Sequence, residues 1–87
     1  MRLSEDTLRD LQARLRRVEG QARGVQRMLE EGRDCAEVLQ QLAAIRTAVA
    51  KVAMALVAEQ LADCLREAGP DQPARLARAK RAFLDLV

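Results

Sequence analysis

Two cysteines, Cys35 and Cys64, are the most chemically distinctive residues of this 87-residue sequence, which contains no histidine. They are 29 positions apart in a stretch that is predicted to form one long helix. At about 1.5 Å per residue their Cα atoms would lie about 43 Å apart, whereas a disulfide requires about 7 Å or less. The two thiols therefore cannot meet within one chain. In an antiparallel dimer they can meet between chains, and a thiol pair across an interface is more typical of a sensor than of a structural disulfide.

The helix start favours a nucleophilic Cys35. This residue follows a presumed N-cap, so the helix dipole and the neighbouring Arg33 favour its thiolate. Asp34 and Glu37, which form an Asp-x-x-Glu capping box, oppose that effect. Cys64 lies among acidic residues and has no evident activation. An activated thiol facing a resolving thiol can trap an electrophilic sulfur species or an oxidant as a covalent bridge.

Other interpretations of the two cysteines stay open. Both could be small buried residues, because free cysteine is often buried. Two thiolates also suit Cu(I) or Zn(II), but zinc needs about four ligands and copper of this type usually a third soft one. Gln60, one turn before Cys64, offers only an amide, and Met54 lies too many turns away. In a reducing compartment, a metal or redox site is favoured over a structural disulfide.

Composition predicts a single helical domain spanning residues 1–87. Apolar residues make up 49% of the sequence and charged residues 32%, with Phe83 as the one aromatic residue. This balance is typical of helical bundles and coiled coils, and so short a chain buries a marginal core alone, which favours oligomers. No apolar run approaches the ~20 residues needed to cross a bilayer, and the N-terminus has no signal-peptide core. A soluble, cytoplasmic protein without a membrane partner is expected.

Capping signals divide the chain into three helices and leave no strand. The first is predicted at about 4–31, with Ser4 as its N-cap, and the second at about 34–68. The third is predicted at about 73–86, with Pro73 at its first position. The first two helices carry apolar residues at alternating steps of three and four, as in a coiled-coil seam. These positions are Leu8, Leu11, Leu15, Val18, Ala22, Val25 and Leu29, then Val38, Leu42, Ile45, Val49, Val52 and Leu56.

The first helix is also strongly basic. Residues 14–27 contain five arginines and one glutamate, whereas residues 34–73 contain three basic and six acidic residues. A polyanion is therefore a plausible partner, although an arginine-rich helix can simply be a solvated face. Gly20 and Gly24 each cost this helix about 1 kcal/mol relative to alanine. Close approach of another helix or of a phosphate backbone is the expected compensation.

Several motifs together resemble one family. The segments Arg14–Met28 (RLRRVEGQARGVQRM), Arg33–Cys35 (RDC), Gln40–Ala48 (QQLAAIRTA) and Leu61–Cys64 (LADC) are similar to the copper-sensing operon repressor (CsoR/RcnR) family. That family also includes nickel/cobalt- and formaldehyde-responsive repressors. The resemblance implies an all-helical antiparallel dimer that pairs into a disc-shaped tetramer. It further implies a repressor that binds operator DNA without a helix-turn-helix and releases it when an inducer occupies the site.

The resemblance also suggests the inducer. Copper sensors of this family use a cysteine from one protomer with a histidine and a cysteine from the other, which map onto Cys35, position 60 and Cys64. Here position 60 is Gln60, so the third copper ligand is missing, and the lack of histidine weakens the nickel/cobalt and formaldehyde interpretations. The pattern resembles the persulfide-sensing branch, in which per- or polysulfide closes an interprotomer di-, tri- or tetrasulfide without a cofactor. Cu(I) bound by the same two cysteines is the alternative.

Four residues are candidates for DNA contact. The family's basic positions map onto Arg14 and Lys51, and Arg17 and Gln21 continue the Arg14 face at steps of three and four. Phosphate contacts from such rows predict binding that weakens steeply with salt, with specificity coming largely from DNA shape. A second row could be contact or solvation, and it contains Arg16, Arg23 and Arg27.

Two other classes of function fit the sequence less well. An enzyme would need a polar pocket with a base or oxyanion donors, and the sequence lacks histidine and any cluster of hydroxyl residues. A structural coiled-coil adaptor explains the heptads but neither the helix glycines nor the clustered arginines. The sequence therefore favours a DNA-binding repressor that is not an enzyme.

Overall fold

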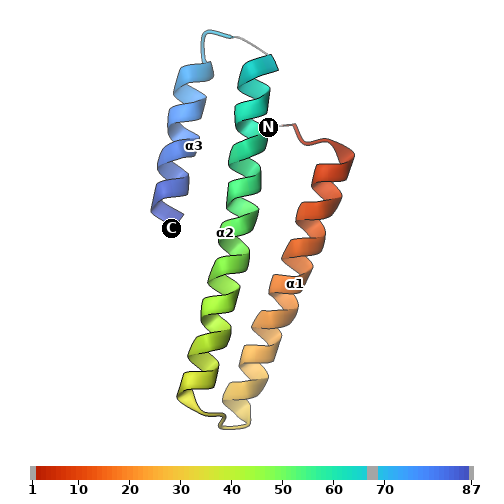
Figure 1. Cartoon of the computed structure of the whole chain (residues 1–87), viewed down its shortest axis with the longest axis vertical. Coiled ribbons are helices and arrows are strands. Elements are labelled where there is room, and N and C mark those ends of the chain that lie inside the picture. Colours follow the sequence, from red (N-terminus) through yellow and green to blue (C-terminus); the bar gives the residue numbers. More distant parts are fainter. Residues whose placement is uncertain (1, 67–68, 87) are drawn as a thin grey trace.

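The computed structural model describes residues 2–66 and 69–86, apart from the side chains of residues 64 and 65. Three helices follow one another: α1 (Glu5–Glu30), α2 (Cys35–Arg66) and α3 (Gln72–Leu86) (Figure 1). The described residues contain no strand, which confirms the prediction of an all-α, three-helix chain. The predicted continuation of the second helix to residue 68 lies outside the described residues.

Local capping explains where α1 begins and ends. The Ser4 hydroxyl accepts a hydrogen bond from the Thr7 backbone N–H at 3.1 Å, as an N-cap does. At the other end Gly32 has a φ of 67°, and the Arg33 N–H donates to the Met28 carbonyl at 3.0 Å. These are the marks of a Schellman motif, in which glycine takes the left-handed conformation at low cost. The tight turn returns the chain antiparallel to α1.

The start of α2 departs from the predicted capping box. The Asp34 carboxylate accepts from the Ala36 N–H at 3.2 Å, so the cap itself is present. Glu37, however, pairs with Arg33 at 2.7 Å, and no hydrogen bond returns it to Asp34 among the described contacts. Both kinds of bond are charge-assisted, but the guanidinium offers Glu37 two N–H donors, Nε at 2.9 Å and Nη2 at 2.7 Å, whereas the Asp34 backbone offers one.

The third helix begins one residue earlier than predicted. Its first residue is Gln72, whose N–H donates to the Gly69 carbonyl at 3.2 Å. Pro73 therefore occupies the second helical position. Proline is tolerated in the first turn because N–H groups there have no intrahelical acceptor.

The three helices form a single layer. Helix α2 lies between α1 and α3 and runs antiparallel to both, and the described parts of α1 and α3 do not contact each other (Figure 1). The Cα atoms extend over 54 × 26 × 13 Å, so the chain is about one helix thick in its shortest direction. Domains usually close a core between two layers, and this chain supplies one of them.

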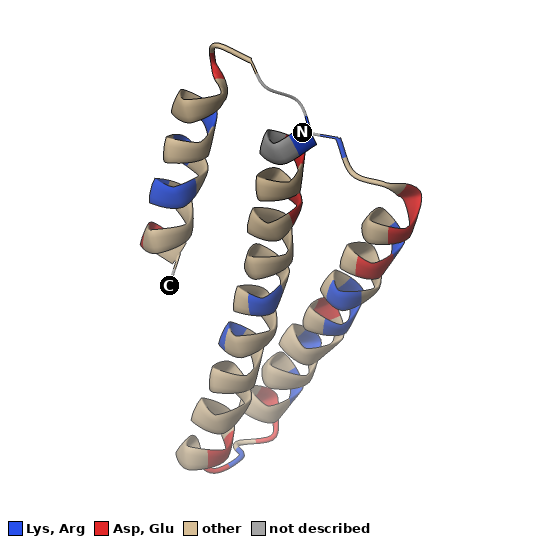
Figure 2. Ribbon diagram, turned by 45° about the horizontal axis from the view of Figure 1, so that its top comes forward, with Lys and Arg blue, Asp and Glu red and all other residues tan. Residues whose placement is uncertain are grey.

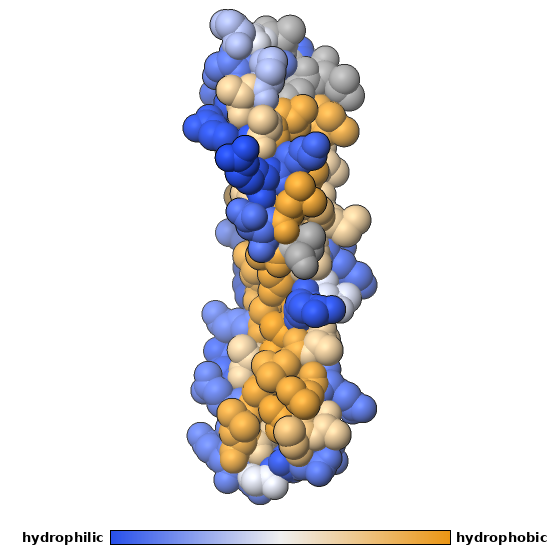
Figure 3. All heavy atoms as spheres, turned by 90° about the vertical axis from the view of Figure 1, so that its left-hand side faces the viewer, coloured by the Kyte–Doolittle hydropathy of each residue, from blue (hydrophilic) through white to orange (hydrophobic). Residues whose placement is uncertain are grey.

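The single layer leaves much of the predicted seam uncovered. Four apolar side chains are buried among the described residues: Leu11, Val25, Val38 and Val52. Other seam residues stay exposed, including Leu8, Leu15, Leu29 and Leu42. Figure 3 shows the resulting apolar stripe, which runs the length of the face formed by α3 and the N-terminal half of α2.

Helix α2 is more apolar than was predicted from its sequence. Its segment Cys35–Asp63 has the length and mean hydropathy, 1.5, of a helix able to cross a membrane. That criterion is one of length and composition only, and the core helix of a soluble bundle meets it too. The expectation of no such apolar stretch was wrong because interruptions such as Arg46 and Lys51 are few among many alanines, leucines and valines.

Candidate thiol site and basic groove

The two cysteines mark the two ends of α2. Cys35 is its first residue and is exposed, while Cys64 is the third residue from its end. The helix is unbroken between them, which holds their Cα atoms about 43 Å apart, far beyond disulfide reach. Twenty-nine steps of about 100° amount to eight turns and about 20°, so both positions lie on nearly the same face of α2. The side chain of Cys64 lies outside the described residues.

The surroundings of Cys35 differ from the expectation in one respect. Arg33 was expected to support the thiolate, but its guanidinium is held by Glu37 at 2.7 Å. Both side chains of this pair are about half exposed. The positive charge beside Cys35 is therefore shared with a carboxylate rather than directed at the sulfur alone.

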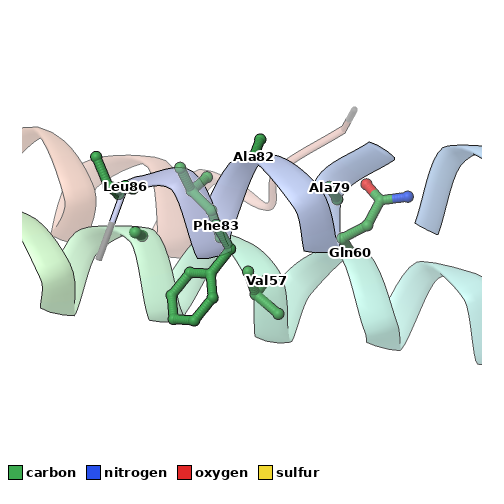
Figure 4. Close-up of a pocket in the computed structure, with 8 residues that line it drawn as sticks. Val57, Gln60, Ala79, Ala82, Phe83 and Leu86 are labelled. Atoms are coloured by element: carbon green, nitrogen blue, oxygen red, sulfur yellow. The ribbon is translucent and has the colours of Figure 1, made fainter. Parts of the chain in front are cut away.

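Gln60 lies at one end of an apolar groove between α2 and α3. The groove has a volume of about 380 Å³, and Gln60 is its one polar lining residue (Figure 4). Figure 4 places Gln60 beside Ala79, with Phe83 and Leu86 farther along the groove. Gln60 precedes Cys64 by one helical turn, at the position where the copper sensors of the family have a histidine. An amide therefore takes the place of an imidazole near the C-terminal end of α2.

The described donor groups of one chain form no metal centre. No cluster of three or more histidine, cysteine, aspartate or glutamate residues that could hold a metal is found within the described residues. The amide of Gln60 is a poor ligand for a soft ion such as Cu(I). Any metal bound here would depend on the two thiols and on a second chain.

The four predicted DNA-contact residues line one groove. Arg14, Arg17 and Gln21 come from α1 and Lys51 comes from α2, around a hollow of about 200 Å³. Small residues of α2 complete the lining: Ala44, Thr47 and Ala48. Residues that lie far apart in the sequence are thus brought together by the antiparallel packing of α1 and α2. We call this feature the basic groove.

The charge of the basic groove is largely uncompensated. Arg14 pairs with Asp10 at 3.0 Å, whereas Arg17 and Lys51 have no acidic partner within the described part of the chain. The Gln21 amide oxygen is buried and unpaired there as well. Figure 2 shows that basic residues outnumber acidic ones along the middle of α1 and α2. The arrangement suits an anion that is larger than one carboxylate.

No helix packs closely against Gly20 or Gly24 within the described residues of this chain. A Cβ atom built on either glycine would meet nothing within 4 Å inside the chain. Gly20 follows Arg17 by three residues and Gly24 follows it by seven. Both glycines therefore lie on the same side of α1 as Arg17, at the edge of the basic groove. The glycines therefore leave a smooth, open surface next to the groove.

The second arginine row is less clearly part of the groove. Arg23 pairs with Glu19 at 3.3 Å, and Arg16 and Arg27 are exposed. None of the three lines the basic groove.

One contact between helices was not predicted. The Thr7 hydroxyl at the start of α1 donates a hydrogen bond to a carboxylate oxygen of Glu59 on α2, at 3.0 Å. The two residues are 52 positions apart, and only the register between α1 and α2 brings them together. No local sequence signal points to the pair.

The sequence of this chain is similar to those of known transcriptional repressors. The family described as "Metal-sensitive transcriptional repressor" matches residues 7–85. The chain is 45% identical over 78 residues to the copper-sensing transcriptional repressor RicR of Mycobacterium tuberculosis, covering 85% of this chain and 81% of that protein. It is 40% identical over 55 residues to the copper-sensing transcriptional repressor CsoR of Bacillus subtilis, covering 63% of this chain and 54% of that protein.

Solved structures show the same fold. The nickel-responsive transcriptional regulator InrS superposes with a TM-score of 0.77 at 35% identity, covering 95% of this chain and 99% of that one. A variant of the formaldehyde-responsive regulator FrmR from Salmonella enterica serovar Typhimurium superposes with a TM-score of 0.82 at 31% identity, covering 99% and 100%. The chain therefore belongs to the CsoR/RcnR family of metal-sensitive transcriptional repressors.

Proposed function

We propose that this chain is a cytoplasmic repressor that leaves its operator when Cys35 of one protomer and Cys64 of the partner subunit are joined by per- or polysulfide. The observation that carries the proposal is that the Cα positions of both cysteines lie on one face of α2, eight turns apart, with Gln60 in place of a histidine. The DNA-binding half of the proposal depends on the basic groove.

The basic groove is the proposed contact surface for the DNA backbone. Three cationic side chains and one amide converge there with little acidic compensation. The alanines of α2 and the open glycines of α1 leave room for a phosphate backbone to come close. Such contacts release counterions, so binding should weaken steeply as salt rises.

The thiol face of α2 is the proposed interface with a second chain. Two antiparallel copies of α2 that bring Cys35 to Cys64 of the partner subunit have a two-fold axis level with residues 49 and 50. The same symmetry then forms the second thiol pair at the other end. Leu39 and Leu42, which lie near this face, are 58% and 45% exposed in the single chain. A second copy of α2 would bury these apolar side chains. Further pairing into a disc-shaped tetramer is the family's implication.

The proposed bridge forms in two balanced steps. The Cys35 thiolate attacks the sulfane sulfur of a persulfide R–S–SH, which breaks the S–S bond, leaves a Cys35 persulfide and releases the thiolate R–S⁻. The thiolate of the partner's Cys64 then attacks the cysteine sulfur and expels hydrosulfide, which forms a disulfide. The two thiols are oxidised by two electrons, and the sulfane sulfur is reduced to sulfide. If both cysteines first become persulfides, loss of one hydrosulfide leaves a trisulfide.

The donor set argues for a sulfur inducer over Cu(I). RicR, at 45% identity, is a copper-sensing repressor, while InrS and FrmR respond to nickel and formaldehyde. The inducer thus differs among proteins of this fold, and the residues of the sensing site decide it. With Gln60 in the third position, two thiols can still form a sulfur bridge but lack the third soft ligand for Cu(I).

Binding to a 30-base-pair duplex that the wild-type protein selects from a random pool tests the proposal. Fluorescence anisotropy should show affinity that falls with salt and is lost after treatment with sodium tetrasulfide but kept with Cu(I). Cys35→Ser and Cys64→Ser should each bind the duplex and ignore tetrasulfide. Release by Cu(I) with indifference to tetrasulfide would assign copper sensing instead, and failure to enrich any duplex would reject a repressor.

A further inference from the structure

The Thr7–Glu59 hydrogen bond differs in kind from every other described polar contact of the chain. The other described side-chain hydrogen bonds and ion pairs join residues at most four positions apart. The bond from Thr7 to Glu59 is partly buried, and within the described residues it is the one that joins two helices by side chains. The rest of the described α1–α2 packing has no directional side-chain bond, and apolar contacts have no direction.

The bond is also the end of a short chain of hydroxyl groups. The Ser4 hydroxyl donates to the Thr7 hydroxyl at 2.9 Å, and the Thr7 hydroxyl donates to Glu59 at 3.0 Å. Hydrogen bonds to an ionised carboxylate are stronger than neutral ones, and bonds in series polarise each other. Glu59 also brings negative charge to the N-terminus of α1, where the helix dipole favours it. Several effects therefore hold α1 to α2 at this one point.

The tie lies in register with the basic groove. Thr7, Arg14 and Gln21 follow one another at intervals of seven residues, or about two turns, on one side of α1. On the antiparallel α2, a move of eight residues from Glu59 reaches Lys51. The groove therefore starts about 10 Å along the same seam. Sliding or turning α1 against α2 would change the separation of Arg14 and Lys51 across the groove.

The α2 side of the basic groove offers few large apolar side chains that would fix the register there. The α2 side of the basic groove presents Ala44 and Ala48, which offer a shallow surface. The directional Thr7–Glu59 bond near the N-terminus of α1 therefore helps to fix the register of α1 on α2. Glu59 also directly precedes Gln60 and lies five residues before Cys64, so the tie joins α1 to the thiol-bearing end of α2.

We infer that Thr7 and Glu59 are positioning residues that set the register of α1 on α2 and thereby the spacing of Arg14 and Lys51 for DNA. This inference rests on the proposed DNA-binding function and adds to it a mechanical link. A change at the Cys64 end of α2 reaches the basic groove through the tie. Neither residue needs to touch DNA.

Thr7→Val tests the inference because it removes the hydroxyl and keeps the shape of the side chain. The N-cap survives, since the Ser4 hydroxyl accepts from the backbone N–H of residue 7. Binding to the selected 30-base-pair duplex should weaken about tenfold, with a shallower salt dependence, at a temperature where circular dichroism shows the protein folded. Thr7→Ser should restore affinity to within about twofold of wild type. Glu59→Gln should lie between Thr7→Val and wild type.

A matched control and a second measurement separate the possible failures. Glu5→Gln removes a carboxylate from the same first turn, where Glu5 makes an exposed 3.8 Å pair with Arg9, and should leave binding unchanged. Hydrogen exchange should speed up in Thr7→Val both at the first turns of α1 and around residue 59. Wild-type affinity and salt dependence in Thr7→Val, or unchanged exchange, would overturn the inference. If wild type binds no duplex, the proposed function fails, and hydrogen exchange still decides whether the tie holds α1.

Discussion

Cys35 and Cys64 lie on nearly the same face of one unbroken helix, eight turns apart. Each thiol therefore requires a second chain to find the other, and a two-fold antiparallel pair satisfies both at once. The first point to test is therefore which chain supplies each sulfur of the bridge.

Complementation of the two cysteine variants addresses that question. Cys35→Ser and Cys64→Ser should each fail to form a covalent dimer with sodium tetrasulfide, because each keeps one member of the pair. Co-expression of the two variants with different tags should restore one bridge in the mixed dimer. Non-reducing electrophoresis distinguishes the three samples by mass. A covalent dimer in either variant alone would contradict the pairing of Cys35 with Cys64.

Neutralising the basic groove should weaken DNA binding. Arg14→Ala and Lys51→Ala should each lower affinity for the selected duplex about tenfold and reduce the slope of log affinity against log salt by about one. Anisotropy titrations between low and moderate salt measure both quantities. Arg27→Ala is the matched control, because this arginine is exposed and lies outside the groove lining. Equal losses in the control would place the DNA elsewhere on α1.

Gly24→Ala should separate stability from binding. Alanine favours a helix interior by about 1 kcal/mol over glycine, and a Cβ at this position meets nothing within 4 Å in the chain. Chemical denaturation should therefore show a more stable protein, while affinity for DNA should fall because the added methyl group keeps the backbone at a distance. A loss of stability would instead indicate that another protein chain packs against this glycine.

Gln60→His should move the chain toward copper sensing. An imidazole one turn before Cys64 supplies the missing third ligand, so affinity for Cu(I) should rise at least about tenfold in competition with a chromophoric chelator. DNA release by Cu(I) should follow the gain in affinity. Gln60→Asn controls for a change of side chain without a metal ligand. Tight Cu(I) binding by wild type, with no gain in the variant, would show that the glutamine does not decide the inducer.

Much of the fold could be predicted because its signals are local. Ser4 caps α1, and Gly32 ends it in a left-handed turn, as residues of these types do. Periodicity also placed Arg17 and Gln21 on the same side of a helix as Arg14. The structure brings Lys51, which the family resemblance had suggested, to these residues from across the seam.

Features that depend on competition or register could not be predicted in this way. Glu37 had two possible partners, and it pairs with the guanidinium of Arg33 instead of the backbone N–H of Asp34 that the capping box requires. Thr7 meets Glu59 only after the α1–α2 register is fixed. The compensation expected for Gly20 and Gly24 is absent among the described residues, because a single layer of helices places no other helix of this chain against them.

The central claim is tested most directly by mass spectrometry of the wild-type protein after sodium tetrasulfide and, separately, after Cu(I). The account predicts a covalent dimer after tetrasulfide, with digestion yielding one cross-linked species that joins the Cys35 peptide to the Cys64 peptide through two or more sulfurs. Peptides linked Cys35 to Cys35 or Cys64 to Cys64, or a monomer that stays uncrosslinked while binding Cu(I) tightly, would contradict it.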